Sequence, residues 1–517
     1  MSEPKRQPEK YQNLSGEVIR GAAWMVSMRW VMRLIGLGST VVLARLLAPE
    51  DFGLIAMVAL VTGFLTIFAD AGVELAVIRL PELTPVHLNT AWTIRLILKT
   101  IIALAIISVA DPAAQFFAED RLYPILLVSA GTVFIDAFGN MASATFRQQL
   151  LFRKDFIYNL IPRAIGAVAT IILAIIFRNY WALVIGTIFA TLSRIVTGYV
   201  MSDNRPSLSL QARKDILGFS LWIMIRDLAN FFRTQFDQLI IARYFGAQTL
   251  GPYYLAGDVA NMLSSELVQP LGRALLPGYA KVANDKERLQ RSYRRVVGAF
   301  ATFTLPITMA LAFVAEDFVT IVFGPKWIEV IPLLQILIIG AAASNISSAA
   351  GPLLMALGKA REVSLIRVGE VMLLAFTLWF AAQFGESITA IAWAKTTTSL
   401  LFLPLMLYIG AGNLAKLFEI SHAFIRPLIA TSIMVAAMIV FHQDSLSAFL
   451  RTGLDLMIGG FVYIISILFL WRLSKHEAGI EFELVEYFSK RFPLFGTALY
   501  FVTGYSLDKK NFYRNLH

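Results

Sequence analysis

The chain has 517 residues, of which 57% are hydrophobic and only 15% charged, and its mean hydropathy is +0.67. Soluble globular proteins have roughly 45–50% apolar and about 25% charged residues, so this composition excludes an ordinary soluble domain. The net charge of +10 does not indicate nucleic-acid binding, because the basic residues lie in short segments between apolar stretches, where they direct membrane topology. The chain has no cysteine, which excludes disulfide and thiolate chemistry.

Apolar stretches recur along nearly the whole chain at lengths of about 20 residues, the length an α-helix needs to cross a bilayer. They are continuously apolar rather than alternating, which predicts helices rather than a β-barrel. The expected fold class is an all-α polytopic membrane protein with about 14 transmembrane helices. These are expected at residues 21–46, 52–78, 91–110, 122–146, 156–177, 180–201, 216–245, 251–277, 296–315, 330–357, 363–383, 387–411, 424–441 and 453–471.

Charge predicts the orientation of the chain. Residues 1–20 are polar and basic and lack the apolar core of a signal peptide, so they are expected to be a cytoplasmic tail. Connections on the same side are basic, such as Arg205 with Arg213, whereas opposite connections carry residues such as Asp111 and Asp444. The bias predicts that both termini are cytoplasmic, with 472–517 a cytoplasmic or interfacial tail.

An internal repeat appears when the sequence is shifted by 198 residues. The segment "VVLARLLAPEDFGLIAM" (41–57) then aligns with "LIIARYFGAQTLGPYYL" (239–255), which places Gly53 over Gly251. Two unrelated hydrophobic hairpins are the alternative interpretation. A true repeat predicts two six-helix lobes related by a pseudo-two-fold axis, with two further helices. The expected divisions are an N-lobe at 21–201, a cytoplasmic linker at 202–215, a C-lobe at 216–411, and helices 13 and 14 at 412–471.

Two segments carry a family resemblance. The text "GAAWMVSMRWVMRLIGLGSTVVLARLLAPEDFGLIAM", followed by "FADAGVELAVIR", and the later "FDQLIIARYFGAQTLGPYYLAGDVANM" resemble polysaccharide transporters of the multidrug/oligosaccharidyl-lipid/polysaccharide exporter superfamily, in particular the Wzx-type, colanic-acid-like flippases. The resemblance implies a V-shaped pair of lobes that moves an undecaprenyl-pyrophosphate-linked oligosaccharide across the bacterial inner membrane by alternating access. It also implies membrane lipids and the polysaccharide polymerase machinery as partners.

A polar stripe is expected on the helix at 216–245. Its members recur at intervals of three or four residues, so they share one helical face. Guanidinium groups match phosphate oxygens, so this stripe and two arginines of the first helix are predicted to bind a pyrophosphate-linked substrate. The predicted substrate-binding residues are Arg29, Arg33, Trp222, Arg226, Asn230 and Arg233, with Tyr253 and Tyr254 as further sugar-stacking candidates. The alternative is mutual neutralisation, Arg233 with Asp237 or Arg29 with Asp227.

Acidic residues in the membrane are candidates for a coupling ion, either H⁺ or Na⁺. These are Asp70, Glu74, Asp237 and Asp258. The alternative is ion pairing, for Asp70 and Glu74 with Arg29, Arg33 or Arg273. Other intramembrane charges, including Arg95, Asp136 and Arg194, are attributed to anchoring, packing and cavity lining, and Arg243 to an interfacial anchor.

The sequence contains no motif that indicates an enzyme. It contains no metalloprotease-type His-Glu spacing, no phosphate loop and no dinucleotide fingerprint, so neither a metal site nor a cofactor is expected. Two alternatives to a flippase stay open. One is a cation-coupled multidrug exporter of the same superfamily, and the other a membrane-embedded polysaccharide polymerase, which would normally need a longer catalytic loop.

Overall fold

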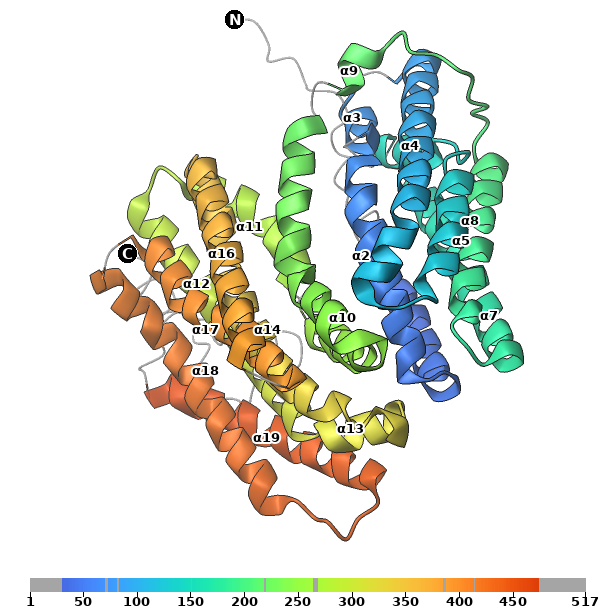
Figure 1. Cartoon of the computed structure of the whole chain (residues 1–517). Helices are drawn as coiled ribbons and strands as arrows, with labels where there is room; N and C mark the ends of the chain where they lie inside the picture. Colours follow the sequence, from blue (N-terminus) through green and yellow to red (C-terminus); the bar gives the residue numbers. More distant parts are fainter. Residues whose placement is uncertain are drawn as a thin grey trace, which may run out of the picture. The chain divides into compact units, whose positions relative to one another are not determined.

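The computed structural model describes residues 30–69, 73–80, 83–149, 151–217, 220–263, 268–384, 387–412 and 414–473. These residues form helices joined by loops, without a β-strand in the described part (Figure 1). The chain divides into two compact units, Met1–Tyr254 and Leu255–His517. The division falls inside a long helix rather than in the expected linker at 202–215, and the lobe boundaries taken from the sequence stay a prediction.

The first unit contains a helix at 30–46 and nine further elements. They are α2 (Pro49–Ala69), α3 (Val73–Arg79), α4 (Pro85–Phe117), α5 (Leu122–Asp136), α6 (Ala142–Gln148), α7 (Phe152–Phe177), α8 (Trp181–Met201), α9 (Arg213–Leu217) and the first part of α10 (Ser220–Leu263).

Local sequence explains where α4 begins and how α7 and α8 pack. Thr84 caps α4, since its hydroxyl accepts a hydrogen bond from the backbone N–H of His87, and Pro85 opens the first turn. A Cβ on Gly186 would lie 1.8 Å from Thr170 Oγ1. Only a residue without a side chain fits there, so the backbones of α7 and α8 approach closely.

Two expected spans of the first unit are each divided between two helices. The span at 52–78 consists of α2 and α3, and the span at 122–146 consists of α5 and α6 separated by residues 137–141. In α10, Gly246 has φ 78° and ψ −178°, so two helices meet at this residue, which lies between the expected spans at 216–245 and 251–277. The break at 137–141 exposes backbone groups inside the bundle, which must find partners there.

The second unit continues from the end of α10. Its elements are α11 (Gln269–Val282), α12 (Lys286–Phe313), α13 (Ala315–Val322), η2 (Pro325–Trp327), α14 (Val330–Ser347), α15 (Ala350–Ala356), α16 (Ala360–Phe384), α17 (Ile388–Ala411), α18 (Leu414–Phe441) and α19 (Ala448–Leu473).

Two hydrophobic clusters hold the second unit together. One gathers side chains of α12, α15 and α17 around the fully buried Tyr293. The other joins α18 to α19 around Met438, whose sulfur would lie 2.7 Å from a Cβ on Gly459. Tyr463 of α19 also donates its hydroxyl hydrogen to the carbonyl of Thr302 in α12, at 2.7 Å. The helices α18 and α19 are therefore packed onto this unit rather than appended loosely.

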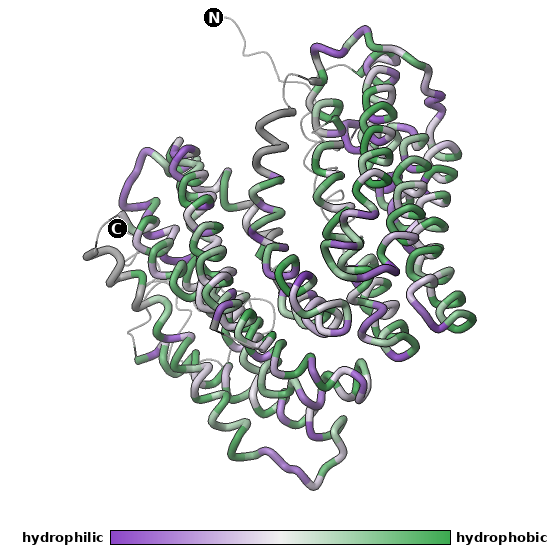
Figure 2. Tube along the Cα trace, in the orientation of Figure 1, coloured by the Kyte–Doolittle hydropathy of each residue, from purple (hydrophilic) through white to green (hydrophobic). Residues whose placement is uncertain are grey.

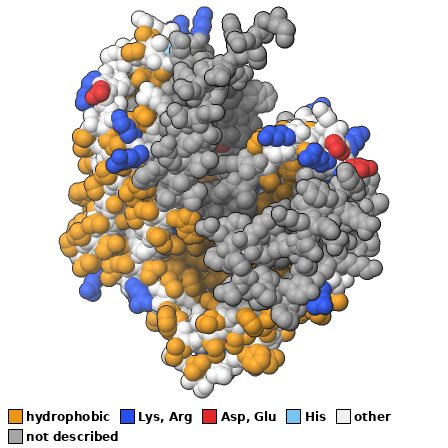
Figure 3. All heavy atoms as spheres, turned by 180° about the vertical axis from the view of Figure 1, so that it is seen from behind, with side chains coloured by type: hydrophobic (Ala, Val, Ile, Leu, Met, Phe, Trp, Pro, Cys, Tyr) orange, Lys and Arg blue, Asp and Glu red, His pale blue; other side chains and the backbone are white. Residues whose placement is uncertain are grey.

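Ten helices in the described residues are long and apolar enough to cross a membrane, and α5 is a shorter apolar helix. Figure 2 shows apolar residues along these helices and hydrophilic residues in the connection between α8 and α9. The described side chains on the face in Figure 3 are mostly hydrophobic. A polytopic all-α membrane fold is thus confirmed, and the expected number of fourteen spans stays a prediction.

Candidate functional site

The residues of the polar stripe on α10 become more buried along the helix. Asn230 is exposed, Arg233 is partly exposed, and Asp237 is fully buried. Arg233 Nη2 donates to Asn230 Oδ1 at 3.1 Å, so the amide orients the guanidinium. Asn230 and Arg233 therefore form the accessible part of the predicted site.

Asp237 belongs to the corner of α10 rather than to an open surface. The hydroxyl of Tyr253, from the helix beyond Gly246, donates to Asp237 Oδ2 at 2.5 Å, and both residues are 0% exposed. The contact ties the two helices of α10 together. The prediction that Tyr253 stacks against sugar is wrong, because its ring is buried in this corner, whereas Tyr254 is 37% exposed.

The structure describes the side chains of only some of the other predicted substrate residues. Arg29 lies outside the described residues, and so do the side chains of Trp222 and Arg226, although both residues belong to α10. Arg33 is partly exposed in the first helix. The guanidinium of Arg163, from α7, comes within 2.7 Å of the position a Cβ on Gly36 would take, three residues after Arg33. Arg163 thus adds a second guanidinium beside the first helix.

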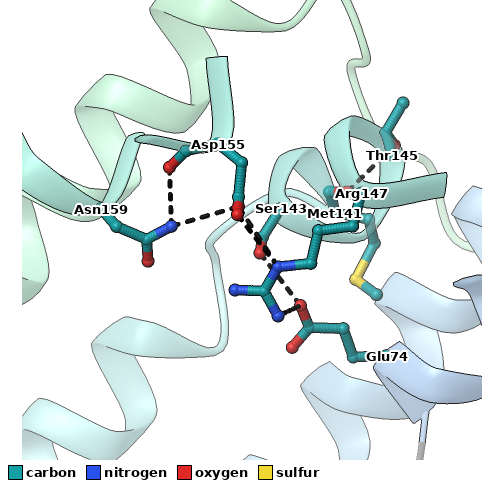
Figure 4. A network of polar contacts seen from close by, with 7 residues as sticks. All are labelled: Glu74, Met141, Ser143, Thr145, Arg147, Asp155 and Asn159. Carbon is teal, nitrogen blue, oxygen red and sulfur yellow. Dashed lines mark hydrogen bonds and ion pairs between the residues drawn. The ribbon is translucent and has the colours of Figure 1, made fainter. Parts of the chain in front are cut away.

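Glu74 lies in a polar network at the junction of α3, α6 and α7 (Figure 4). Arg147 Nη1 lies 3.2 Å from Glu74 Oε1, and Arg147 Nε lies 3.3 Å from Asp155. Ser143 also donates to Glu74 at 3.0 Å, while Asn159 donates to Asp155 Oδ1 at 3.1 Å. Glu74 is therefore ion-paired, as the alternative interpretation held, and it pairs with Arg147, which the sequence had not suggested as a partner.

Of the two remaining ion-coupling candidates, the structure describes only Asp258. Asp70 lies outside the described residues. Asp258 is exposed on the part of α10 that belongs to the second unit. Among the candidates whose side chains are described, Asp237 is the one removed from water.

A cationic cluster that the sequence did not single out surrounds Asp136. Arg95 Nη2 donates to Asp136 Oδ2 at 3.0 Å and to its backbone carbonyl at 2.9 Å, and Lys99 donates to the same carboxylate oxygen. Arg194 of α8 lies within electrostatic range of this carboxylate. Three cations face one carboxylate, so the cluster, Arg95, Lys99, Asp136 and Arg194, carries an excess of positive charge.

The cluster lies where the helix breaks between α5 and α6. Tyr199 donates to the carbonyl of Phe138 at 2.8 Å, and the buried Asn140 donates to the carbonyl of Gly198 at 2.9 Å. Arg95 likewise donates a hydrogen bond to the backbone carbonyl of Asp136. The break is therefore held by side chains of α4 and α8. Discontinuous membrane helices of this kind often accompany solute sites, since their ends present unpaired backbone groups.

Taken together, the helices define a polytopic α-helical membrane protein, and Arg95, Lys99 and Arg194 give it a cluster with excess positive charge. The polysaccharide biosynthesis protein family matches residues 42–332, more than half of the chain, and the chain belongs to this family.

The chain is also similar to three individual proteins. It is 26% identical to the lipopolysaccharide biosynthesis protein WzxC of Escherichia coli over 352 residues, 66% of this chain and 71% of that one. An uncharacterized membrane protein from the cps region of Klebsiella pneumoniae is 26% identical over 470 residues, 88% of this chain and 95% of that one. The inward closed structure of the lipid II flippase MurJ has a TM-score of 0.69 at 13% identity, over 87% of this chain and 99% of that one, so the two share a fold.

Proposed function

We propose that the chain is a flippase that moves an undecaprenyl-pyrophosphate-linked oligosaccharide repeat unit across the bacterial inner membrane by alternating access. Its product would serve surface polysaccharide biosynthesis, as exopolysaccharide, capsule or O-antigen. Membership of the polysaccharide biosynthesis protein family over residues 42–332 is the observation that carries this proposal. The similarity to WzxC and the fold shared with the lipid II flippase MurJ support it.

Charge supports the same class of substrate. Guanidinium groups stay protonated at any physiological pH and bind phosphate oxygens through paired donors. The first unit presents accessible or partly accessible cations at Arg33, Arg163, Arg194 and Arg233. A cationic drug would be repelled by these groups, which disfavours the multidrug exporter. Arg29, Arg33, Arg226 and Arg233 are proposed to bind the pyrophosphate, with Asn230 and Trp222 beside them.

We further propose on which side of the membrane the termini lie and which ion drives transport. Both termini are proposed to be cytoplasmic, because the basic connections fall on one side. The protein is proposed to act without a cofactor and without catalysing a covalent reaction, with H⁺ or Na⁺ as its coupling ion. Asp237 is the favoured ion-coupling group, since it is fully buried on a helix that also carries Arg233. Polysaccharide polymerase machinery would receive the translocated repeat unit.

An export assay tests the proposal. The double variant Arg226→Ala and Arg233→Ala is expected to abolish polymer export while lipid-linked repeat units accumulate on the cytoplasmic leaflet. Arg243→Ala is the matched control, because Arg243 lies on the same helix but is exposed and packs 5.3 Å from the ring centroid of Phe116. Unchanged export in the double variant, at equal protein in the membrane, would remove the site assignment. Transport of cationic dyes instead would favour the drug exporter, and glycosyl transfer by the purified protein the polymerase.

A further inference from the structure

The loop between α18 and α19 places a histidine between two carboxylates. His442 Nδ1 lies 2.9 Å from Asp455 Oδ2 on α19, and His442 Nε2 lies 3.4 Å from Asp444 Oδ1 in the loop. Of the two contacts, the one to Asp455 is a hydrogen bond, and a neutral imidazole can make it with its single N–H while leaving the charge of Asp455 uncompensated. The arrangement accommodates one additional proton, carried either by the ring or by a carboxyl group.

The two carboxylates differ in their access to water. The side chain of Asp455 is 1% exposed, whereas that of Asp444 is 90% exposed. Asp455 Oδ1 is buried and has no hydrogen-bond partner among the residues that the structure describes. A buried carboxylate without a counter-charge is strongly disfavoured, and more so inside a membrane protein. Asp455 therefore needs either the positive charge of His442 or a proton of its own.

The nearby arginine is already engaged. Arg451 lies one turn before Asp455 on α19, but its Nε donates to Asp317 Oδ2 of α13 at 2.7 Å. Its Nη1 lies 3.6 Å from Asp444, and its field also reaches Glu316. The ring of Phe313 packs perpendicular to that of His442 at 5.5 Å. The groups that face the histidine thus carry more negative than permanent positive charge, which favours a bound proton.

We propose that His442 and Asp455 form a proton-binding site between the loop that follows α18 and the helix α19, with the partly exposed His442 as its contact with water. The ligand is a proton, and it belongs to the pair rather than to either residue. Binding neutralises Asp455, the acidic residue of α19, and release restores a buried negative charge beneath the loop. The site lies outside the family match at 42–332 and does not depend on the identity of the transported substrate.

Nitrogen NMR of the full-length protein in lipid nanodiscs tests the site. The chain has five histidines, so ¹⁵N-labelled histidine gives few signals, and His442→Gln identifies the signal of this residue. The wild-type spectrum is recorded at neutral pH, and the expected result is one proton held by the His442–Asp455 pair. The spectrum then shows either two ring N–H groups on His442 or a hydrogen bond from a neutral carboxyl group, which infrared spectroscopy detects.

Variants separate proton binding from an ordinary structural hydrogen bond. Asp455→Asn should leave His442 with one ring N–H and remove the carboxyl band. His87, whose Nδ1 lies 2.8 Å from the hydroxyl of Thr84, is an internal reference that should be unaffected. A wild-type spectrum with a neutral ring and an ionised carboxylate overturns the proposal, even if Asp455→Asn does not fold. A ring that keeps both protons in folded Asp455→Asn overturns it as well.

Discussion

Gly53 and Gly251 make reciprocal contacts within the first unit. A Cβ on Gly53 would lie 1.8 Å from the carbonyl oxygen of Ala247, and a Cβ on Gly251 would lie 1.9 Å from the carbonyl oxygen of Pro49. Ala247 stands 198 residues after Pro49, as Gly251 does after Gly53. Equivalent positions of the proposed repeat therefore exchange equivalent contacts, which is what a pseudo-two-fold axis requires.

Replacing either glycine should separate the two backbones. Gly53→Ala or Gly251→Ala forces a methyl group onto a carbonyl oxygen, and overpacking of this kind costs about 1–3 kcal/mol. We expect a lower unfolding temperature in detergent and reduced polymer export. Gly257→Ala is the control, since no atom lies within 4 Å of its Cβ position. Equal stability of all three variants would show that the backbones at Gly53 can move apart freely.

The helices were predictable from sequence because they depend on local apolar composition. The repeat stays a prediction, which the reciprocal contacts of Gly53 and Gly251 support. Long-range polar contacts were not predictable. Arg147 reaches Glu74 across 73 residues, and no helical spacing relates them. The break at 137–141 has only the weak signals of Gly139 and Asn140, and its stability depends on Arg95 and Tyr199 from other helices.

The candidate coupling residues Glu74 and Asp237 differ in burial, so they should respond differently to substitution. Glu74→Gln should leave export nearly unchanged, since Glu74 is exposed and surface ion pairs contribute about 0–1 kcal/mol. Asp237→Asn should impair export, because its buried carboxylate is the favoured ion-coupling group. Export measured at equal protein levels checks both. Loss of export in Glu74→Gln with normal export in Asp237→Asn would reverse the assignment.

Tyr253→Phe should destabilise the corner of α10 without changing its shape. The substitution removes the donor to Asp237 Oδ2 and leaves a buried polar group short of a hydrogen bond, a loss of about 1–3 kcal/mol. Thermal unfolding of the purified protein measures it. Tyr244→Phe is the matched control, because Tyr244 is 72% exposed on the same helix. A similar unfolding temperature for both variants would contradict the structural weight given to this contact.

Replacing Asp136 should destabilise the protein more than replacing one of the cations that contact it. Asp136→Asn leaves Arg95 and Lys99 partly buried without their carboxylate, and a hydrogen bond to a charged group contributes about 1.5–3 kcal/mol. Lys99→Met leaves the Arg95–Asp136 contact in place and should have a smaller effect. The two unfolding temperatures and the amounts of folded protein in the membrane decide the order. The opposite order would mean that Lys99, rather than Asp136, organises the cluster.

The second unit should lose stability in acid through Asp317. The hydrogen bond from Arg451 holds the pKa of Asp317 below its usual range, against the opposing effect of burial. Because the folded-state pKa is lowered, this contribution is complete above the ordinary aspartate pKa of about 3.9 and is lost as pH falls through the folded value. Asp317→Asn should therefore lower the unfolding temperature at neutral pH and reduce its dependence on pH below about 4. Asp120→Asn, at an exposed position, is the control, and an unchanged acid dependence in Asp317→Asn would contradict the assignment.

Membrane topology can be tested directly because the chain has no cysteine, so any introduced thiol is the single one present. Leu208→Cys lies in the connection between α8 and α9, which carries Arg205 and leads to Arg213 at the start of α9, and the side chain of Leu208 is 74% exposed. Ser445→Cys lies in the exposed loop between α18 and α19, beside Asp444. The positive-inside bias places position 208 in the cytoplasm and position 445 outside. A membrane-impermeant maleimide should therefore label Ser445→Cys in intact spheroplasts and Leu208→Cys only after permeabilisation. Labelling of both from the same side would contradict the arrangement of fourteen spans, because an odd number of crossings must separate these positions.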